Sequence, residues 1–199
     1  MIAGAPEPVA GAPDPGPHRV SLYNIANLLT MARIALVPVF VWLLFLEGTG
    51  WRLAAFGVFA LASVTDKIDG DLARRYNLVT DFGKIADPIA DKALTGAALI
   101  SLSLLGELWW WVTAAILVRE IGVTLLRFVV IRYGVIPASK GGKLKTTLQV
   151  IAIGLYILPG PLDPVRWATM AAALVVTVVT GADYVVQAWR LRKAGRAKA

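Results

Sequence analysis

Four aspartates, Asp66, Asp69, Asp87 and Asp91, occur in two pairs at helical spacing. The first pair is three residues apart and the second is four residues apart, so each pair lies on one face of a helix. Both pairs adjoin apolar stretches typical of membrane helices, where a carboxylate is costly and therefore indicates a function. Mg²⁺ and Mn²⁺ prefer oxygen ligands, and paired metals can stabilise the attacking and leaving oxygens of a phosphoryl transfer. The spacing predicts a site for divalent cations.

A structural alternative is that these acids form ion pairs in the membrane with Lys67, Lys84 and Lys92. Four acids at two helical spacings are more than such pairing requires, so we favour the metal site. Asp71 and Asp81 fall outside the spacing, and we interpret them as surface or helix-start residues.

The composition indicates an all-α integral membrane protein. Hydrophobic residues make up 57% of the 199 residues, and the mean hydropathy is +0.67, which exceeds the values of ordinary soluble domains. The net charge is +7, but the basic residues flank apolar runs. We therefore expect membrane lipids and phosphorylated substrates as partners, and no nucleic acid. The chain has no cysteine and one histidine, His18, which argues against thiolate chemistry and a histidine-based zinc site.

Hydropathy predicts six transmembrane helices, at about 20 apolar residues per span. We place them at roughly 28–46, 51–76, 81–105, 108–133, 146–158 and 167–189. Residues 1–20 form an Ala/Pro/Gly-rich leader that we expect to be disordered. Residues 21–190 form the membrane domain, and residues 191–199 form a basic cytoplasmic tail.

Charge asymmetry predicts the orientation of this bundle. Basic residues concentrate around the second–third and fourth–fifth connections and in the tail, at Arg74, Arg75, Lys84, Arg132, Lys140, Lys143, Lys145, Arg190, Arg192, Lys193, Arg196 and Lys198. The positive-inside rule therefore puts these segments and both termini in the cytoplasm. Residues 53–65 and 93–105 are charge-free, and each run spans only about 20 Å of a hydrocarbon core about 30 Å thick. The aspartates are thus expected just beneath the cytoplasmic surface, a depth that suits a lipid headgroup.

The full motif, D-x2-D-G-x2-A-R-x8-G-x3-D-x3-D, resembles the signature of the CDP-alcohol phosphotransferase family. All eight fixed positions match, at Asp66, Asp69, Gly70, Ala73, Arg74, Gly83, Asp87 and Asp91. The resemblance implies that two divalent cations, Mg²⁺ or Mn²⁺, bind the diphosphate of CDP-diacylglycerol while an alcohol displaces CMP.

The resemblance also implies individual roles. Asp66, Asp69 and Asp87 would be metal ligands, and Asp91 would be both a ligand and the catalytic base. The CDP-lipid would contact motif residues and the first helix, at Gly70, Ala73, Arg74, Gly83, Asn27, Thr30 and Arg33. An alternative for Arg33 is an arginine that extends toward the interface, with its charge in water.

Other segments resemble the bacterial branch of the family whose acceptor is glycerol 3-phosphate. These segments are residues 24–33, 80–84, 87–92, 118–121 and 142–149. In the first of them, Ala26 stands where that branch usually has proline. Four basic residues would bind the acceptor phosphate: Arg119, Arg127, Lys143 and Lys145. The alternatives are a buried pair of Arg119 with Glu120, and ordinary positive-inside charge for the lysines. The branch further implies a homodimer in the bacterial inner membrane, with its active site facing the cytoplasm.

Several rival functions remain open at this point. The same chemistry could use inositol 1-phosphate or phosphatidylglycerol as the acceptor. A divalent-cation transporter would also use acids within the membrane. A structural scaffold ranks last, because it leaves the cost of the buried acids unexplained.

Overall fold

The computed structural model describes residues 25–75, 81–130 and 140–196, which are helical except for three short loops. The helices are α1 (Ile25–Leu44), α2 (Thr49–Arg75), α3 (Asp81–Leu104), α4 (Trp110–Val130), α5 (Lys140–Ile157) and α6 (Asp163–Arg196). Within these ranges there is no strand. The all-α prediction is therefore confirmed for the part of the chain that the structure describes, whereas the predicted leader lies outside it.

Two helices are longer than hydropathy predicts. α5 begins at Lys140 rather than at 146, and α6 extends from Asp163 to Arg196 rather than from 167 to 189. The predicted ends were wrong because they followed the end of the apolar run, whereas backbone hydrogen bonds continue a helix through polar residues. The first residues of the predicted basic tail therefore form the last turns of α6.

The three described loops are short turns that reverse the chain. Residues 45–48, 105–109 and 158–162 connect α1 to α2, α3 to α4 and α5 to α6. Each loop contains a glycine with positive φ: Gly48 at 116°, Gly106 at 74° and Gly160 at 126°. Residues with a Cβ rarely adopt this conformation, so these glycines allow consecutive helices to run antiparallel.

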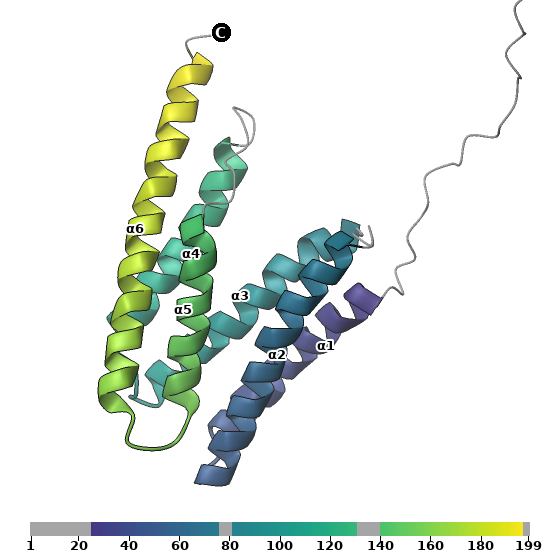
Figure 1. Ribbon diagram of the computed structural model, residues 1–199, viewed down its shortest axis with the longest axis vertical. Coiled ribbons are helices and arrows are strands. Elements are labelled where there is room, and N and C mark those ends of the chain that lie inside the picture. The colour runs from purple at the N-terminus through teal and green to yellow at the C-terminus, as the bar shows by residue number, and fades with distance from the viewer. Residues whose placement is uncertain (1–24, 76–80, 131–139, 197–199) are drawn as a thin grey trace, which may run out of the picture.

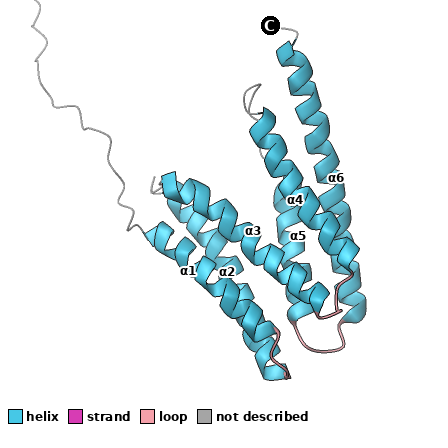
Figure 2. Cartoon of the chain, turned by 180° about the vertical axis from the view of Figure 1, so that it is seen from behind, coloured by secondary structure: helices cyan, strands magenta, loops and turns pink. Residues whose placement is uncertain are grey.

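The helices form two groups of three, α1–α3 and α4–α6 (Figures 1 and 2). The three short loops lie at one end of the bundle. At the other end lie the start of α1, the end of α2 with the start of α3, the end of α4 with the start of α5, and the end of α6. We call this second end the motif end, because the helical turns that carry the four aspartates lie toward it.

An apolar core joins the two groups. Phe40 of α1 and Phe59 of α2 are buried, with ring centroids 5.7 Å apart. Leu99 of α3, Ile116 of α4 and Ile153 of α5 are fully buried in the same cluster. Burial of this apolar surface holds the helices together and fixes how α3 packs against α4 and α5.

The outward faces of the helices are also apolar. Exposed large side chains include Trp42 (61%), Leu61 (56%), Val118 (71%) and Val179 (61%). Apolar surface on this scale is typical of contact with lipid or another protein rather than with water. α6 is long and apolar enough to cross a membrane over Asp163–Lys193, whereas α1 and α3 contain the shorter apolar stretches Leu28–Leu44 and Lys92–Leu104.

Two arginines close the end of the bundle opposite the motif end. Arg52 of α2 donates to the carbonyl oxygens of Tyr156 (2.9 Å) and Ile157 (3.2 Å), and it forms a two-point ion pair with Glu107. Arg166 of α6 donates to the carbonyl oxygens of Leu155 and Leu158. Both arginines satisfy carbonyls at the C-terminal end of α5, where a positive charge is favourable.

Candidate active site

The two aspartate pairs lie on continuous helices. α2 runs unbroken through Asp66 and Asp69, and α3 runs through Asp87 and Asp91. The two aspartates of each pair are therefore about one helical turn apart on the same helix, as the spacing predicts. The side chains of Asp69, Asp87 and Asp91 lie outside the described residues, as do those of Gly70, Ala73, Arg74 and Gly83.

Asp66 forms an ion pair with an arginine on another helix. Arg33 Nη1 of α1 lies 2.5 Å from Asp66 Oδ1 of α2. The Arg33 side chain is only 2% exposed, so the interpretation of Arg33 as an arginine extending into water is wrong. Thr30 lies one turn before Arg33 and is also buried, whereas the side chain of Asn27 is not among those described. α1 therefore contributes a buried cation to the aspartate motif.

The donor set of the motif fits hard divalent cations. All four candidate ligands are carboxylates, and carboxylate oxygens suit Mg²⁺ or Mn²⁺. Of these four aspartates, Asp66 is the one whose side chain the structure describes, and 39% of that side chain is exposed. An ion can therefore reach this carboxylate although Arg33 lies beside it.

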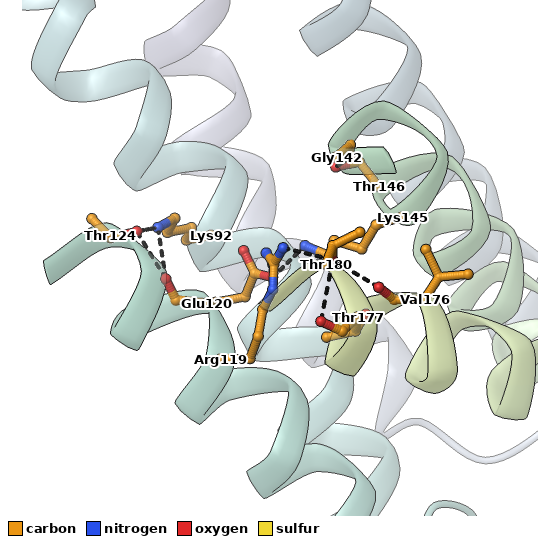
Figure 3. Close-up of polar contacts among 10 residues, drawn as sticks. All are labelled: Lys92, Arg119, Glu120, Thr124, Gly142, Lys145, Thr146, Val176, Thr177 and Thr180. Carbon is orange, nitrogen blue, oxygen red and sulfur yellow. Dashed lines mark hydrogen bonds and ion pairs between the residues drawn. The ribbon is translucent and has the colours of Figure 1, made fainter. Parts of the chain in front are cut away.

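A second polar cluster lies between α4 and α5, centred on Glu120 (Figure 3). Glu120 Oε1 accepts from Arg119 Nη1 at 3.1 Å and from Lys145 Nζ. The side chains of Arg119, Glu120 and Lys145 are 13%, 17% and 7% exposed. We call these three residues the Glu120 cluster. The cluster brings two of the four predicted acceptor residues together. It also contains the pair of Arg119 with Glu120 that the sequence offered as an alternative role for Arg119.

The Glu120 cluster also contacts the helix that carries Asp87 and Asp91. Lys92 of α3 donates to the carbonyl oxygen of Glu120 at 3.3 Å and to Thr124 Oγ1 of α4. Lys92 directly follows Asp91, so this contact joins the end of the aspartate motif to α4. The described contacts of Lys92 are therefore with α4, while the side chains of Asp87 and Asp91 lie outside the described residues.

Lys143, a third predicted acceptor residue, is not among the described contacts of the cluster. Lys143 is exposed, and its side chain makes none of the described hydrogen bonds or ion pairs. It lies two residues before Lys145, so the two side chains project from different faces of α5. Arg127 is on α4, but its side chain lies outside the described residues.

The electrostatics of the cluster suit an anion. Arg119 and Lys145 are two cations that bind the Glu120 carboxylate, and Lys92 is a third cation that binds the backbone carbonyl of Glu120. This excess of positive charge in a half-buried site favours a phosphate group, which accepts charge-assisted hydrogen bonds. The structure thus joins a basic cluster, through Lys92, to the helix that carries Asp87 and Asp91.

Sequence reasoning did not predict two contacts of this site. The Arg33–Asp66 pair joins residues 33 positions apart, and the Thr180 hydroxyl of α6 accepts from Arg119 Nη2 at 2.9 Å. The only sign in the sequence that Arg33 is buried is that this charged residue lies in an apolar helix. Nothing in the sequence indicated the contact of Thr180, because threonine is common in membrane helices.

The family model for CDP-alcohol phosphatidyltransferases matches residues 23–179, and the chain belongs to this family of membrane enzymes. A relative from Mycobacterium tuberculosis, named as a probable phosphatidylglycerophosphate synthase, is 55% identical over 177 residues, covering 86% of this chain and 85% of the relative.

Two relatives bear the name CDP-diacylglycerol–glycerol-3-phosphate 3-phosphatidyltransferase. The one from Bacillus subtilis is 39% identical over 191 residues, which cover 86% of this chain and 98% of the relative. The one from Escherichia coli is 39% identical over 166 residues, which cover 79% of this chain and 89% of the relative. The family resemblance inferred from the motif is confirmed.

Proposed function

We propose that this protein transfers the phosphatidyl group of CDP-diacylglycerol to glycerol 3-phosphate, giving phosphatidylglycerophosphate and CMP. The observation that carries the proposal is the Glu120 cluster, a basic site joined through Lys92 to the helix of Asp87 and Asp91. Such a site suits an acceptor that is itself a phosphate ester. The names of the relatives support the same acceptor.

The proposed reaction is a single displacement at phosphorus. The acceptor hydroxyl oxygen attacks the lipid-side phosphorus of CDP-diacylglycerol, and a new P–O bond forms. The bond from that phosphorus to the oxygen of CMP breaks, and CMP leaves with the electron pair. Asp91 accepts the hydroxyl proton as the oxygen becomes acidic in the transition state.

Asp66, Asp69, Asp87 and Asp91 would hold two divalent cations, Mg²⁺ or Mn²⁺. When bound, these cations neutralise the charge of the diphosphate and stabilise the leaving oxygen. Arg33 holds the Asp66 carboxylate from α1, so that this ligand does not need to be ordered when substrate binds. The CDP-lipid would further contact Asn27, Thr30, Gly70, Ala73, Arg74 and Gly83.

Arg119 and Lys145 would bind the acceptor phosphate and orient its hydroxyl toward Asp91. Their burial strengthens charge-assisted hydrogen bonds to the phosphate. Arg127 of α4 would be a further ligand of the acceptor phosphate. Lys143, which is exposed at the start of α5, would attract the acceptor from outside the cluster.

We further propose that the six helices span the bacterial inner membrane, with both termini and the motif end in the cytoplasm, and that the protein is a homodimer. The support for this orientation is that the facing ends of α2 and α3, the facing ends of α4 and α5, and the end of α6 carry basic residues and lie at the motif end. At this end the lipid diphosphate would arrive from the bilayer and the acceptor from the cytoplasm.

The test is the release of CMP by the purified full chain given CDP-diacylglycerol and Mg²⁺ with one acceptor at a time. The proposal expects release with glycerol 3-phosphate, and phosphatidylglycerophosphate as the product by mass spectrometry. Release only with inositol 1-phosphate or only with phosphatidylglycerol would overturn the acceptor. Transport of Mg²⁺ into protein-containing vesicles without any CDP-lipid, and no CMP release, would favour the transporter.

A further inference from the structure

The buried face of α6 carries a group of residues that lies against Arg119. Thr180 is 8% exposed, Tyr184 is 3% exposed, and Gly181 is buried between them. Thr180 and Tyr184 are four residues apart, so they lie on one face of the helix. α6 lies beside α4 in Figure 1, and α4 carries Arg119. α6 otherwise has no part in the proposed site.

Thr180 offers Arg119 an acceptor with a fixed direction. Its hydroxyl donates to the carbonyl oxygens of Val176 (2.7 Å) and Thr177 (3.2 Å), which engages its single hydrogen. A hydroxyl has one hydrogen and two lone pairs, so the oxygen meets Arg119 Nη2 as an acceptor, at 2.9 Å. Figure 3 shows this hydroxyl between the α6 carbonyls and the guanidinium.

Gly181 and Tyr184 fit the rest of the arginine side chain. A Cβ at position 181 would lie 3.1 Å from Arg119 Cγ and 3.6 Å from its Nε. A methyl group there would push the stem of the arginine by a few tenths of an ångström. The guanidinium carbon lies 6.0 Å from the centroid of the Tyr184 ring, within the range of a cation–π interaction.

These contacts determine the orientation of the guanidinium. Glu120 accepts from Nη1 and Thr180 accepts from Nη2, so the plane of the group is held at two points from two helices. The guanidinium has five N–H bonds, and these two contacts engage two of them. The group is therefore ordered before a phosphate binds, which lowers the entropy cost of binding.

We propose that Thr180, Gly181 and Tyr184 form a cradle on α6 that positions Arg119 for the phosphate of the acceptor. This inference rests on the proposed function, which makes Arg119 a ligand of that phosphate. The three α6 residues are positioning residues and act through Arg119. The cradle makes α6 a determinant of affinity for the acceptor but not for the CDP-lipid.

The test compares Thr180→Val and Gly181→Ala with the wild-type full chain in detergent or vesicles. Thr180→Val keeps the shape but removes the acceptor, and Gly181→Ala displaces the arginine stem. We expect each to raise the KM for glycerol 3-phosphate by roughly three- to tenfold, while the KM for CDP-diacylglycerol changes by less than about twofold. Thr180→Ser keeps the hydroxyl and should retain a KM near that of the wild type.

Matched controls come from the same chain. Thr169 on α6 bonds the carbonyls of Val165 and Arg166 in the same way as Thr180 bonds its own, so Thr169→Val removes a similar bond away from Arg119. Gly122 on α4 has no atom within 4 Å of an added Cβ, so Gly122→Ala adds a methyl group without displacing Arg119. Both controls should leave the KM values of the two substrates unchanged.

The outcomes separate the cradle from the proposed function. If the wild type releases CMP only with another acceptor, the glycerol 3-phosphate assignment fails, and the cradle is judged by the KM of that acceptor. The cradle is overturned if Arg119→Ala raises the acceptor KM while Thr180→Val and Gly181→Ala leave it unchanged. It is also overturned if both variants raise the two KM values equally and lower the thermal midpoint, because that pattern indicates a general packing defect.

Discussion

Arg33 of α1 and Asp66 of α2 form an ion pair at 2.5 Å, in which the arginine side chain is 2% exposed and the aspartate side chain is 39% exposed. The buried partner is the cation, and the more accessible partner is the candidate metal ligand. This asymmetry means that α1 supports the aspartate from inside the bundle, while part of the aspartate side chain stays accessible.

Replacing Arg33 should reduce activity by more than tenfold, because Asp66 loses the buried cation that binds it from α1. Arg33→Met removes the charge but fills most of the volume of the arginine side chain, whereas Arg33→Ala also leaves a cavity. Arg33→Ala should therefore have the lower thermal midpoint. CMP release and a thermal melt in detergent measure the two effects. Wild-type activity in Arg33→Met would contradict a role for this cation in holding Asp66.

Asp91→Asn should lower turnover by at least about a hundredfold, since the amide cannot accept the hydroxyl proton. Binding of CDP-diacylglycerol should be largely retained, because the other three carboxylates remain. The measurement is kcat together with direct CDP-lipid binding. Asp183→Asn is the matched control, because Asp183 is an exposed residue of α6 that bonds Gln187, and this variant should behave like the wild type. Near-normal turnover in Asp91→Asn would refute the assigned base.

Removal of divalent cations should abolish CMP release, because the diphosphate would lose its charge neutralisation. Addition of Mg²⁺ or Mn²⁺ in excess of the chelator should restore it. Asp66→Asn should raise the cation concentration needed for half-maximal activity. Full activity in excess chelator would be incompatible with the proposed two-metal site.

Lys145 and Lys143 provide a matched pair on one helix. Lys145 is buried against Glu120, and Lys143 is exposed two residues away. Lys145→Ala should raise the KM for glycerol 3-phosphate by at least tenfold, and Lys143→Ala should change it by less than about threefold, because solvent screens an exposed charge. Equal effects of the two substitutions would show that overall positive charge, rather than the Glu120 cluster, binds the acceptor.

Arg52→Ala should destabilise the protein without altering either KM. The substitution leaves the carbonyls of Tyr156 and Ile157 without this donor, at a cost of about 1–3 kcal/mol. Glu107→Ala should cost less than about 1 kcal/mol, since Glu107 is 34% exposed and its ion pair lies partly in solvent. Thermal midpoints in detergent test the order. A larger loss in Glu107→Ala would show that the ion pair, rather than the carbonyl contacts, stabilises this end.

The sequence by itself determined the helices, the aspartate spacing and the family. Helical periodicity and hydropathy are local properties, so the pairs Asp66/Asp69 and Asp87/Asp91 could be assigned to helices from their neighbours alone. The eight motif positions all lie within 26 consecutive residues, which makes the signature readable without any tertiary contact. The ends of α5 and α6 were less predictable, because a helix can extend beyond its apolar segment.

Only the tertiary structure decided which helices support each functional group. Arg33 meets Asp66 across 33 positions, and Arg119 meets Thr180 across 61. These contacts depend on how α1 packs on α2 and how α6 packs on α4, and no local pattern encodes such distances. The same packing separates Lys145 from Lys143, since it buries one face of α5 and leaves the other exposed. Spacing identified the chemistry of the motif, and helix packing determined which charges were buried beside it.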